Sequence, residues 1–68
     1  MSVYKVIELV GTSEKSWEDA ARQAIETASK TLKDLRIAEV KSQDLKIEDG
    51  KIIIYRVRLS LSFRYKEE

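Results

Sequence analysis

The sequence contains no cysteine and no histidine. Disulfides and cysteine- or histidine-based zinc sites are therefore excluded, as are Ser/His/Asp and Cys/His nucleophile systems. Carboxylates are numerous, but no pattern separates an acid from a base, and the lone Gly11 does not make a phosphate-binding loop. We therefore expect a protein that is not an enzyme. The lack of cysteine is compatible with a reducing compartment.

A strong charge imbalance is also missing, because 13 basic residues face 12 acidic ones and the net charge is +1. Such a chain has no overall field that would gather nucleic acid or an anionic membrane. The first residues lack the apolar stretch of a signal peptide, and no segment approaches the length of a membrane span. We expect a soluble, cytoplasmic protein with no nucleic-acid or membrane partner.

The short chain sets a limit on stability. Its 68 residues form one domain, 1–68, and a domain of this size buries only roughly 60% of the surface of its unfolded chain. Because disulfides and zinc are excluded, self-association is the favoured source of additional stability.

The strongest positive signal is the alternation that follows Asp49-Gly50. One predicted strand face carries Ile53, Tyr55, Val57, Leu59, Leu61, Phe63 and Tyr65. The other face carries Ile52, Ile54, Arg56, Arg58, Ser60, Ser62 and Arg64. An alternation of this length predicts a strand in the middle of a sheet that is buried on one face only.

A first strand is predicted at residues 3–10, followed by a turn at residues 11–13. A helix is then predicted from Ser16, whose hydroxyl caps the first turn with Asp19, and Ser13 is the competing start. The helix is expected to end near Asp34 or Leu35. Its apolar stripe consists of Trp17, Ala20, Ala21, Ala24, Ile25, Ala28, Leu32 and Leu35.

A second strand is predicted at residues 36–47, joined to the last strand by a hairpin loop at residues 48–51. This register places Val40 opposite Leu59 and Ala38 opposite Leu61. It also places Gln43 opposite Arg56. A three-residue loop would invert the faces, and Lys41 opposite Arg58 suggests a β-bulge. The expected fold is α+β with the order β-α-β-β: a three-stranded antiparallel sheet with the last strand central and one helix on one face.

The polar strand face has two interpretations. Arginines at positions 56, 58 and 64 match phosphate oxygens, but a solvated or subunit-facing surface with partners such as Glu39 is the favoured interpretation. Nucleic acid is disfavoured, because the basic excess and interleaved stacking aromatics are missing.

Hard cations form a further possibility, because Ca²⁺ takes six to eight oxygen ligands. No loop resembles an EF-hand. A symmetric assembly would have to bring together carboxylates of neighbouring subunits, and the candidates are Glu18, Asp19, Glu39 and Asp44. For each of these residues taken singly, plain solvation is the favoured interpretation.

The sequence resembles the dodecin family over almost its whole length. The resemblance is carried by VIELVGTS at residues 6–13, the alanine-rich helix, residues 35–40 and residues 59–64. It implies a hollow homo-dodecamer with 23 symmetry, helices outside and sheets lining the interior. Typical members store or buffer flavins, stacking paired isoalloxazine rings between tryptophans and binding the polar ring edge through a glutamine.

Three positions depart from that pattern. The resemblance places the tryptophan at Ile37, the glutamine at Arg56, and a basic residue of many flavin-binding members at Asp44. An aromatic stack contributes about 0.5 to 1.5 kcal/mol beyond burial, and Ile37 cannot supply it. Trp17 is expected to be a core or subunit-contact anchor.

The resemblance therefore favours a non-flavin branch of the dodecins for which calcium binding is described. The ligand positions that it implies on the inner sheet face are Ile37, Gln43, Asp44, Arg56 and Arg58. Calcium or a small anion is the expected ligand. The alternatives are riboflavin or FMN bound in an altered geometry, and a scaffold shell without a dedicated ligand.

Overall fold

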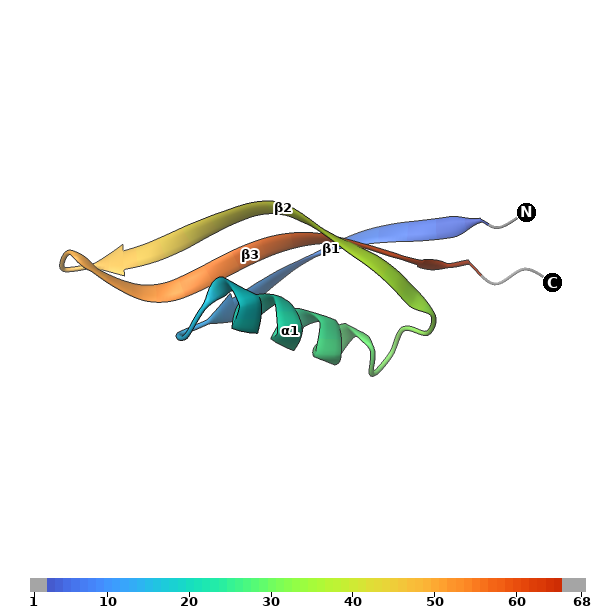
Figure 1. The fold of residues 1–68 in the computed structure, drawn as a ribbon, viewed down its shortest axis with the longest axis horizontal. Helices are drawn as coiled ribbons and strands as arrows, with labels where there is room; N and C mark the ends of the chain where they lie inside the picture. Colours follow the sequence, from blue (N-terminus) through green and yellow to red (C-terminus); the bar gives the residue numbers. More distant parts are fainter. Residues whose placement is uncertain (1–2, 66–68) are drawn as a thin grey trace.

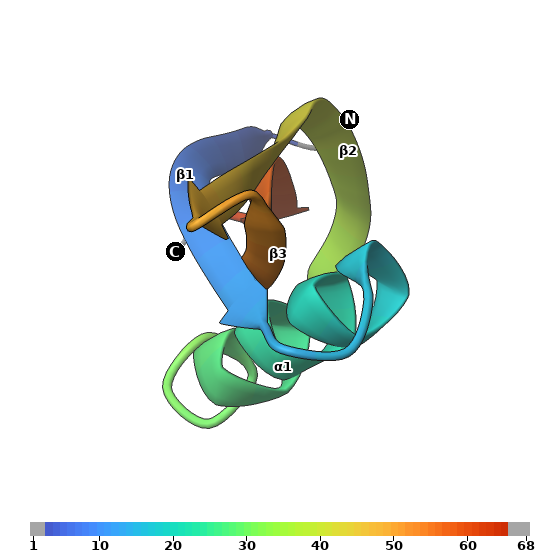
Figure 2. The same ribbon diagram turned by 90° about the vertical axis from the view of Figure 1, so that its left-hand side faces the viewer.

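The computed structural model describes residues 3–65. The elements are strand β1 (Tyr4–Ser13), helix α1 (Trp17–Ala28), strand β2 (Leu35–Glu48) and strand β3 (Lys51–Arg64). The sheet order is β1-β3-β2, and β3 is antiparallel to both neighbours. Helix α1 lies along one side of the sheet, as Figures 1 and 2 show from two directions. The predicted α+β fold with β3 in the centre is confirmed.

The core lies between α1 and the predicted apolar face of β3. Val57, Leu59 and Leu61 are 0%, 1% and 2% exposed. Val57 and Leu59 form one cluster with Ala20 and Ala24 of α1. Small alanine side chains let the helix axis approach the sheet closely, so that modest side chains fill the space between the two layers.

Helix α1 begins as predicted but ends earlier. The side chain of Ser16 accepts a hydrogen bond from the backbone N–H of Asp19, so Ser16 is the N-cap and the alternative start at Ser13 is wrong. The prediction of a helix end near residues 34–35 is also wrong, because α1 ends at Ala28. Bonds of the tighter i to i+3 type follow, and Asp34 has a φ of 60°. The chain therefore turns toward β2 after Ala28, although the helical spacing of apolar residues continues to Leu32 and Leu35.

Strand β1 is longer than predicted. Residues 11–13 were expected to form a turn, but they pair with residues 55–57 of β3. The difference arises because β3 is long. Its buried middle offers backbone hydrogen-bond partners to the residues that follow the β-branched run of β1. This extension brings Gly11 against α1.

The predicted register of β2 holds at residues 37–40 and 47–48, and it is shifted by one residue at residues 42–46. Ala38 lies opposite Leu61 and Val40 opposite Leu59, as predicted. A shift between Val40 and Ser42 then confirms the suspected bulge at Lys41. Beyond it the partner of Arg56 is Asp44, and the predicted pairing of Gln43 with Arg56 is wrong.

Candidate ligand face of the sheet

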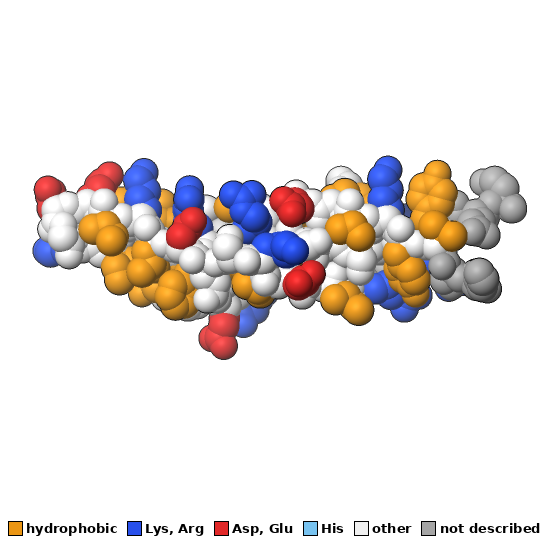
Figure 3. Space-filling view, turned by 90° about the horizontal axis from the view of Figure 1, so that it is seen from above, with side chains coloured by type: hydrophobic (Ala, Val, Ile, Leu, Met, Phe, Trp, Pro, Cys, Tyr) orange, Lys and Arg blue, Asp and Glu red, His pale blue; other side chains and the backbone are white. Residues whose placement is uncertain are grey.

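The face of the sheet that α1 does not cover is called the open face here, and its polar part contains Glu39, Asp44, Arg56 and Arg58. Figure 3 looks onto the molecule from the side opposite α1. Acidic and basic side chains are mixed along its middle, and hydrophobic side chains gather toward both ends. Gln43 lies opposite the buried Val57, so the expected place of Gln43 on this face is wrong.

The best-defined contact on the open face is an ion pair between β3 and β2. Arg56 Nε donates to Asp44 Oδ1 over 2.6 Å, and Arg56 Nη2 donates to Oδ2 over 2.9 Å. Both side chains stay about half exposed, at 49% and 53%. The hydrogen bond from Arg56 lowers the pKa of Asp44 below its ordinary value and raises the pKa of Arg56. Both carboxylate oxygens are therefore engaged by one guanidinium group.

The backbone of Asp44 is held from the other side of the sheet. Trp17 Nε1 donates to the carbonyl oxygen of Asp44 over 3.2 Å. The Trp17 ring contacts the Tyr55 ring edge to face, with the ring centroids 5.5 Å apart. Trp17 also packs against the core cluster. Trp17 was predicted to be a core or subunit-contact anchor, and its packing against the core cluster agrees with the first of these roles. Its hydrogen bond to Asp44 connects the start of α1 to β2.

Arg58 is bound less firmly than Arg56. Its Nη1 atom lies 4.0 Å from Glu8 Oε1 of β1, and both side chains are more than half exposed. Glu8 and Glu39 flank Ser60 in one row across the three strands. Within residues 3–65, Glu39 makes no ion pair. The middle of the open face thus presents a loosely compensated set of charges.

An aliphatic patch lies toward the end of the open face near the start of β1. Ile37 is 67% exposed and Val6 is 58% exposed, one on each side of Ser62. The Ser62 hydroxyl donates to the Ile37 carbonyl oxygen over 3.4 Å. This position therefore offers apolar contact area without an aromatic ring.

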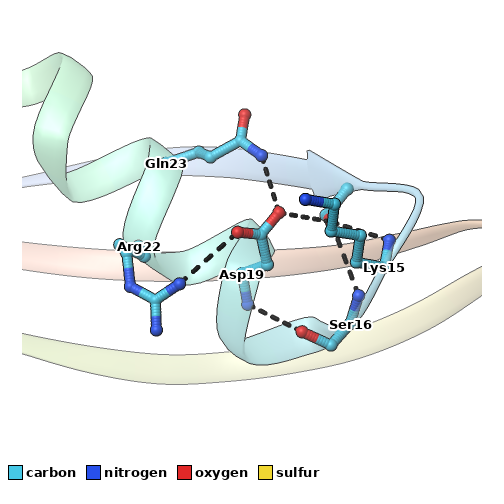
Figure 4. Close-up of polar contacts among 6 residues, drawn as sticks. Lys15, Ser16, Asp19, Arg22 and Gln23 are labelled. Carbon is cyan, nitrogen blue, oxygen red and sulfur yellow. Dashed lines mark hydrogen bonds and ion pairs between the residues drawn. The ribbon is translucent and has the colours of Figure 1, made fainter.

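The four carboxylates expected to bind metal are not gathered by the fold of one chain. Asp44 is paired with Arg56, and Asp19 is enclosed in a polar network at the start of α1, shown in Figure 4. Glu18 is exposed on the helix, and Glu39 is exposed on the open face. Across residues 3–65, no group of three or more carboxylates is placed to hold a metal ion.

Asp19 organises the junction between β1 and α1. Its Oδ2 atom accepts hydrogen bonds of 2.7 Å from Ser13 Oγ and from Gln23 Nε2. Arg22 Nη1 lies 3.4 Å from Oδ1. The Ser13 hydroxyl also accepts from the backbone N–H groups of residues 15 and 16. The sequence predicted the cap and named Ser13 only as an alternative helix start. It did not predict the bond from Ser13 to Asp19, because the place of Ser13 at the strand end depends on pairing with β3.

We expect stability in acid to reveal this network. The hydrogen bonds from Ser13 and Gln23 lower the pKa of Asp19 in the folded state. Its ionised form therefore stabilises the fold above the ordinary aspartate pKa of about 3.9, and this contribution disappears as pH falls through the lower folded-state pKa. Asp19→Asn should lower the urea midpoint at pH 7. The difference in urea midpoint between this variant and the parent chain should become smaller as pH falls below about 4.

Glu18→Gln is the matched control for that measurement, because Glu18 occupies the same helical turn and makes no hydrogen bond or ion pair within residues 3–65. Its urea midpoint should stay close to that of the parent chain at both pH values. A difference between Asp19→Asn and the parent chain that stays constant with pH would contradict the assigned role of the Asp19 charge.

Comparison with known proteins places the chain in a family. A sequence model described as Dodecin matches residues 3–66. The calcium dodecin of Mycobacterium tuberculosis is 44% identical over 66 residues, which cover 97% of this chain and 93% of that protein. The dodecin of Thermus thermophilus is 43% identical over 65 residues, covering 96% of this chain and 94% of that protein.

Solved structures agree with the sequence comparisons. Dodecin from Streptomyces coelicolor superposes with a TM-score of 0.94 at 40% identity, covering 98% of this chain and 96% of that chain. Calcium dodecin from M. tuberculosis, described with a novel calcium-binding site, gives a TM-score of 0.84 at 45% identity over 96% of this chain and 93% of that chain. No helix in residues 3–65 is long and apolar enough to cross a membrane. The chain belongs to the dodecin family.

Proposed function

We propose that the protein is a non-enzymatic binding and storage protein that works as a homo-dodecamer with 23 symmetry, lacks the stacked flavin mode and binds calcium at sites shared between subunits. The observation that carries the proposal is the exposed Ile37 on the open face, where the family resemblance expects a tryptophan. The neighbouring ion pair and the calcium-binding relative support it.

The open face is poorly suited to a stacked flavin pair. Ile37 offers aliphatic contact but no ring face, so the stacking contribution is lost. Arg56 stands at the position of the flavin-edge glutamine, and its donors already bind Asp44 in a bidentate contact. A flavin edge would have to displace that carboxylate before it could use the same donors.

The donor chemistry of the chain suits a hard cation. Neither cysteine nor histidine is present, so carboxylate, carbonyl and hydroxyl oxygens are the available ligands, and these are the ligands that calcium prefers. The described residues of one chain do not gather three carboxylates, so a complete site needs oxygens from other subunits or from water. Bound there, calcium would neutralise carboxylates of neighbouring subunits. Glu18 and Glu39 are the two candidates that make no ion pair within residues 3–65, and of these Glu39 lies on the open face, on edge strand β2.

Assembly is supported by the apolar surface of the isolated subunit. An open cavity of about 570 Å³ lies between α1 and β1, and Ile7, Leu9, Ala28 and Leu32 are among its lining residues. Apolar residues of the strands, including Val6 and Ile37, are also exposed. Such surface in a chain this small is typical of a subunit that is covered by copies of itself.

Paired titrations test the proposed ligand. Calorimetry in metal-free buffer should show saturable Ca²⁺ binding. Glu39→Gln should weaken it by about tenfold or more, since calcium affinity depends on the number of charged ligands. Glu26→Gln, on the exposed side of α1, should leave it unchanged. Riboflavin and FMN fluorescence should show no submicromolar binding.

Three results would count against the proposal. Strong flavin quenching at submicromolar concentration would favour flavin binding in an altered geometry. Absence of a saturable calcium signal would favour a scaffold shell without a dedicated ligand. Light scattering of the same sample should give close to twelve times the subunit mass of 7.9 kDa, and a monomer would contradict the shared sites.

A further inference from the structure

We infer that the tip of the β2–β3 hairpin inserts into the groove between α1 and β1 of a second copy of the chain, and that three subunits close into a ring through such contacts. The tip, residues 46–54, is called the arm. The inference rests on the proposed homo-dodecamer and names the two surfaces that form its threefold contacts. It does not depend on the ligand that the assembly binds.

The arm lies beyond the part of the sheet that the rest of the chain supports. The pairing of β1 with β3 ends at Ser13 opposite Tyr55, and the arm continues past that point as two strands (Figure 1). Isoleucines occupy its positions 47, 52, 53 and 54, and Ile47 and Ile52 are 60% and 50% exposed. A hairpin of only two strands is at best marginally stable in water unless a further strand or a helix packs against it. The arm therefore needs a cover that residues 3–65 of its own chain do not supply.

The groove between α1 and β1 offers a cover of matching polarity. Its volume is about 570 Å³, and none of its eleven lining residues is ionisable. Ile7 and Leu9 of β1 line it together with Ala28 of α1 and Leu32. The arm contains two lysines and two acidic residues, so that it has no net charge. An uncharged groove that receives this arm gains apolar contact without facing a charge of one sign.

The occupant of the groove is a second copy, because the geometry of one chain keeps its own arm away. The arm extends in one direction from the end of β1, whereas α1 and the groove extend in the other (Figure 1). The subunit exposes 5468 Å². A compact monomer of 7.9 kDa would expose about 4,400 Å². The excess of about 1,000 Å² is close to the roughly 800 Å² that each partner buries in a stable interface.

The type of contact determines the symmetry of the ring. An arm in a groove joins two different surfaces, so the contact is heterologous and cannot lie on a twofold axis. Point group 23 contains twofold and threefold axes, and the contact therefore belongs to the threefold axes. Each subunit of the ring inserts one arm and receives another.

Disulfide trapping tests the inference, because the chain has no cysteine of its own. Ile47→Cys combined with Thr27→Cys places one thiol on the arm and one at the exposed edge of the groove. Mild oxidation of the assembled protein should link the chains into covalent trimers, which non-reducing denaturing electrophoresis detects. Ile52→Cys combined with Thr31→Cys is a second pair on the same two surfaces.

The matched control replaces Thr27→Cys by Glu26→Cys. Glu26 is the neighbouring residue of α1 and is exposed, but it does not line the groove. A disulfide needs Cα atoms within roughly 7 Å of each other, so trapping with Ile47→Cys should fall by about tenfold or more in this control. Each single variant should stay unlinked. Ile47→Cys that links to itself would show that two arms meet, and this result would overturn the inference.

The remaining outcomes separate the inference from the proposed function. An assembled protein, by light scattering, in which neither pair forms a link overturns the inference alone, and so do linked products of more than three chains. Loss of assembly in both pairs, with the Glu26→Cys single variant still assembled, supports the contact. A parent chain that stays monomeric overturns both the inference and the proposed assembly. Absence of calcium binding contradicts the proposed ligand and leaves the inference in place.

Discussion

Val57→Asp is expected to leave no folded protein at 25 °C, the largest effect of any substitution considered. Val57 is 0% exposed and lies in one cluster with Ala20, Ala24 and Leu59. An unpaired carboxylate buried there costs several kcal/mol. A domain of 68 residues has roughly 3 to 10 kcal/mol of stability in total. The buried charge therefore removes most or all of the free energy of unfolding.

The measurement is far-UV circular dichroism with urea unfolding. Ile52→Asp is the control, since it introduces the same charge on the same strand at a position that is 50% exposed. It should keep a cooperative unfolding transition. Val57→Ala should cost roughly 2 kcal/mol, the loss expected for two buried methyl groups and a small cavity. Soluble, folded Val57→Asp would show that the face assignment of β3 is wrong.

Gly11→Ala is expected to destabilise the fold by about 3 kcal/mol, the upper end of the usual cost of overpacking. A Cβ atom at Gly11 would lie 2.3 Å from the carbonyl oxygen of Ala20 and 3.0 Å from the Cβ of Ala24. The first contact involves helix backbone, which no rotamer change can relieve. The added methyl group must therefore push α1 away from β1.

Two variants check this reason by urea unfolding. Gly50→Ala meets no atom within 4 Å, but its φ of +74° strains any side chain, so a cost of about 1 to 2 kcal/mol is expected there. Gly11→Ala combined with Ala24→Gly should not recover the lost stability, because the Ala20 carbonyl stays in place. Full recovery in the double variant would place the clash at Ala24 instead.

Much of the fold was predictable from local patterns. The alternation of β3 identified the buried Val57 and Leu59, and Ser16 with Asp19 identified the start of α1. These signals are local, because a strand repeats every two residues and a cap joins groups three residues apart. The end of α1 was not predictable in this way. Leu32 keeps the helical spacing and lines the cavity between α1 and β1 after the helix has ended.

The candidate site was predictable only in part. Arg56 and Asp44 were both expected at ligand positions, but their pairing with each other was not. Register shifts at Lys41 and between Lys46 and Ile47 displace residues 42–46 by one position against β3. This displacement brings Asp44 opposite Arg56 and moves Gln43 to the other face. The bond from Trp17 to Asp44 joins residues far apart in the chain, and no local pattern signals it.

The sequence by itself determined the order of the elements and the buried face of β3, since periodicity and capping act between near neighbours in the chain. It also determined the donor chemistry of the open face, because Ile37 and the absence of histidine and cysteine are visible before folding. Only the tertiary structure decided that Arg56 binds the carboxylate of Asp44 and that Trp17 donates to its backbone carbonyl oxygen. Those contacts depend on how β2 is bulged against β3 and on where α1 begins, and packing between elements sets both.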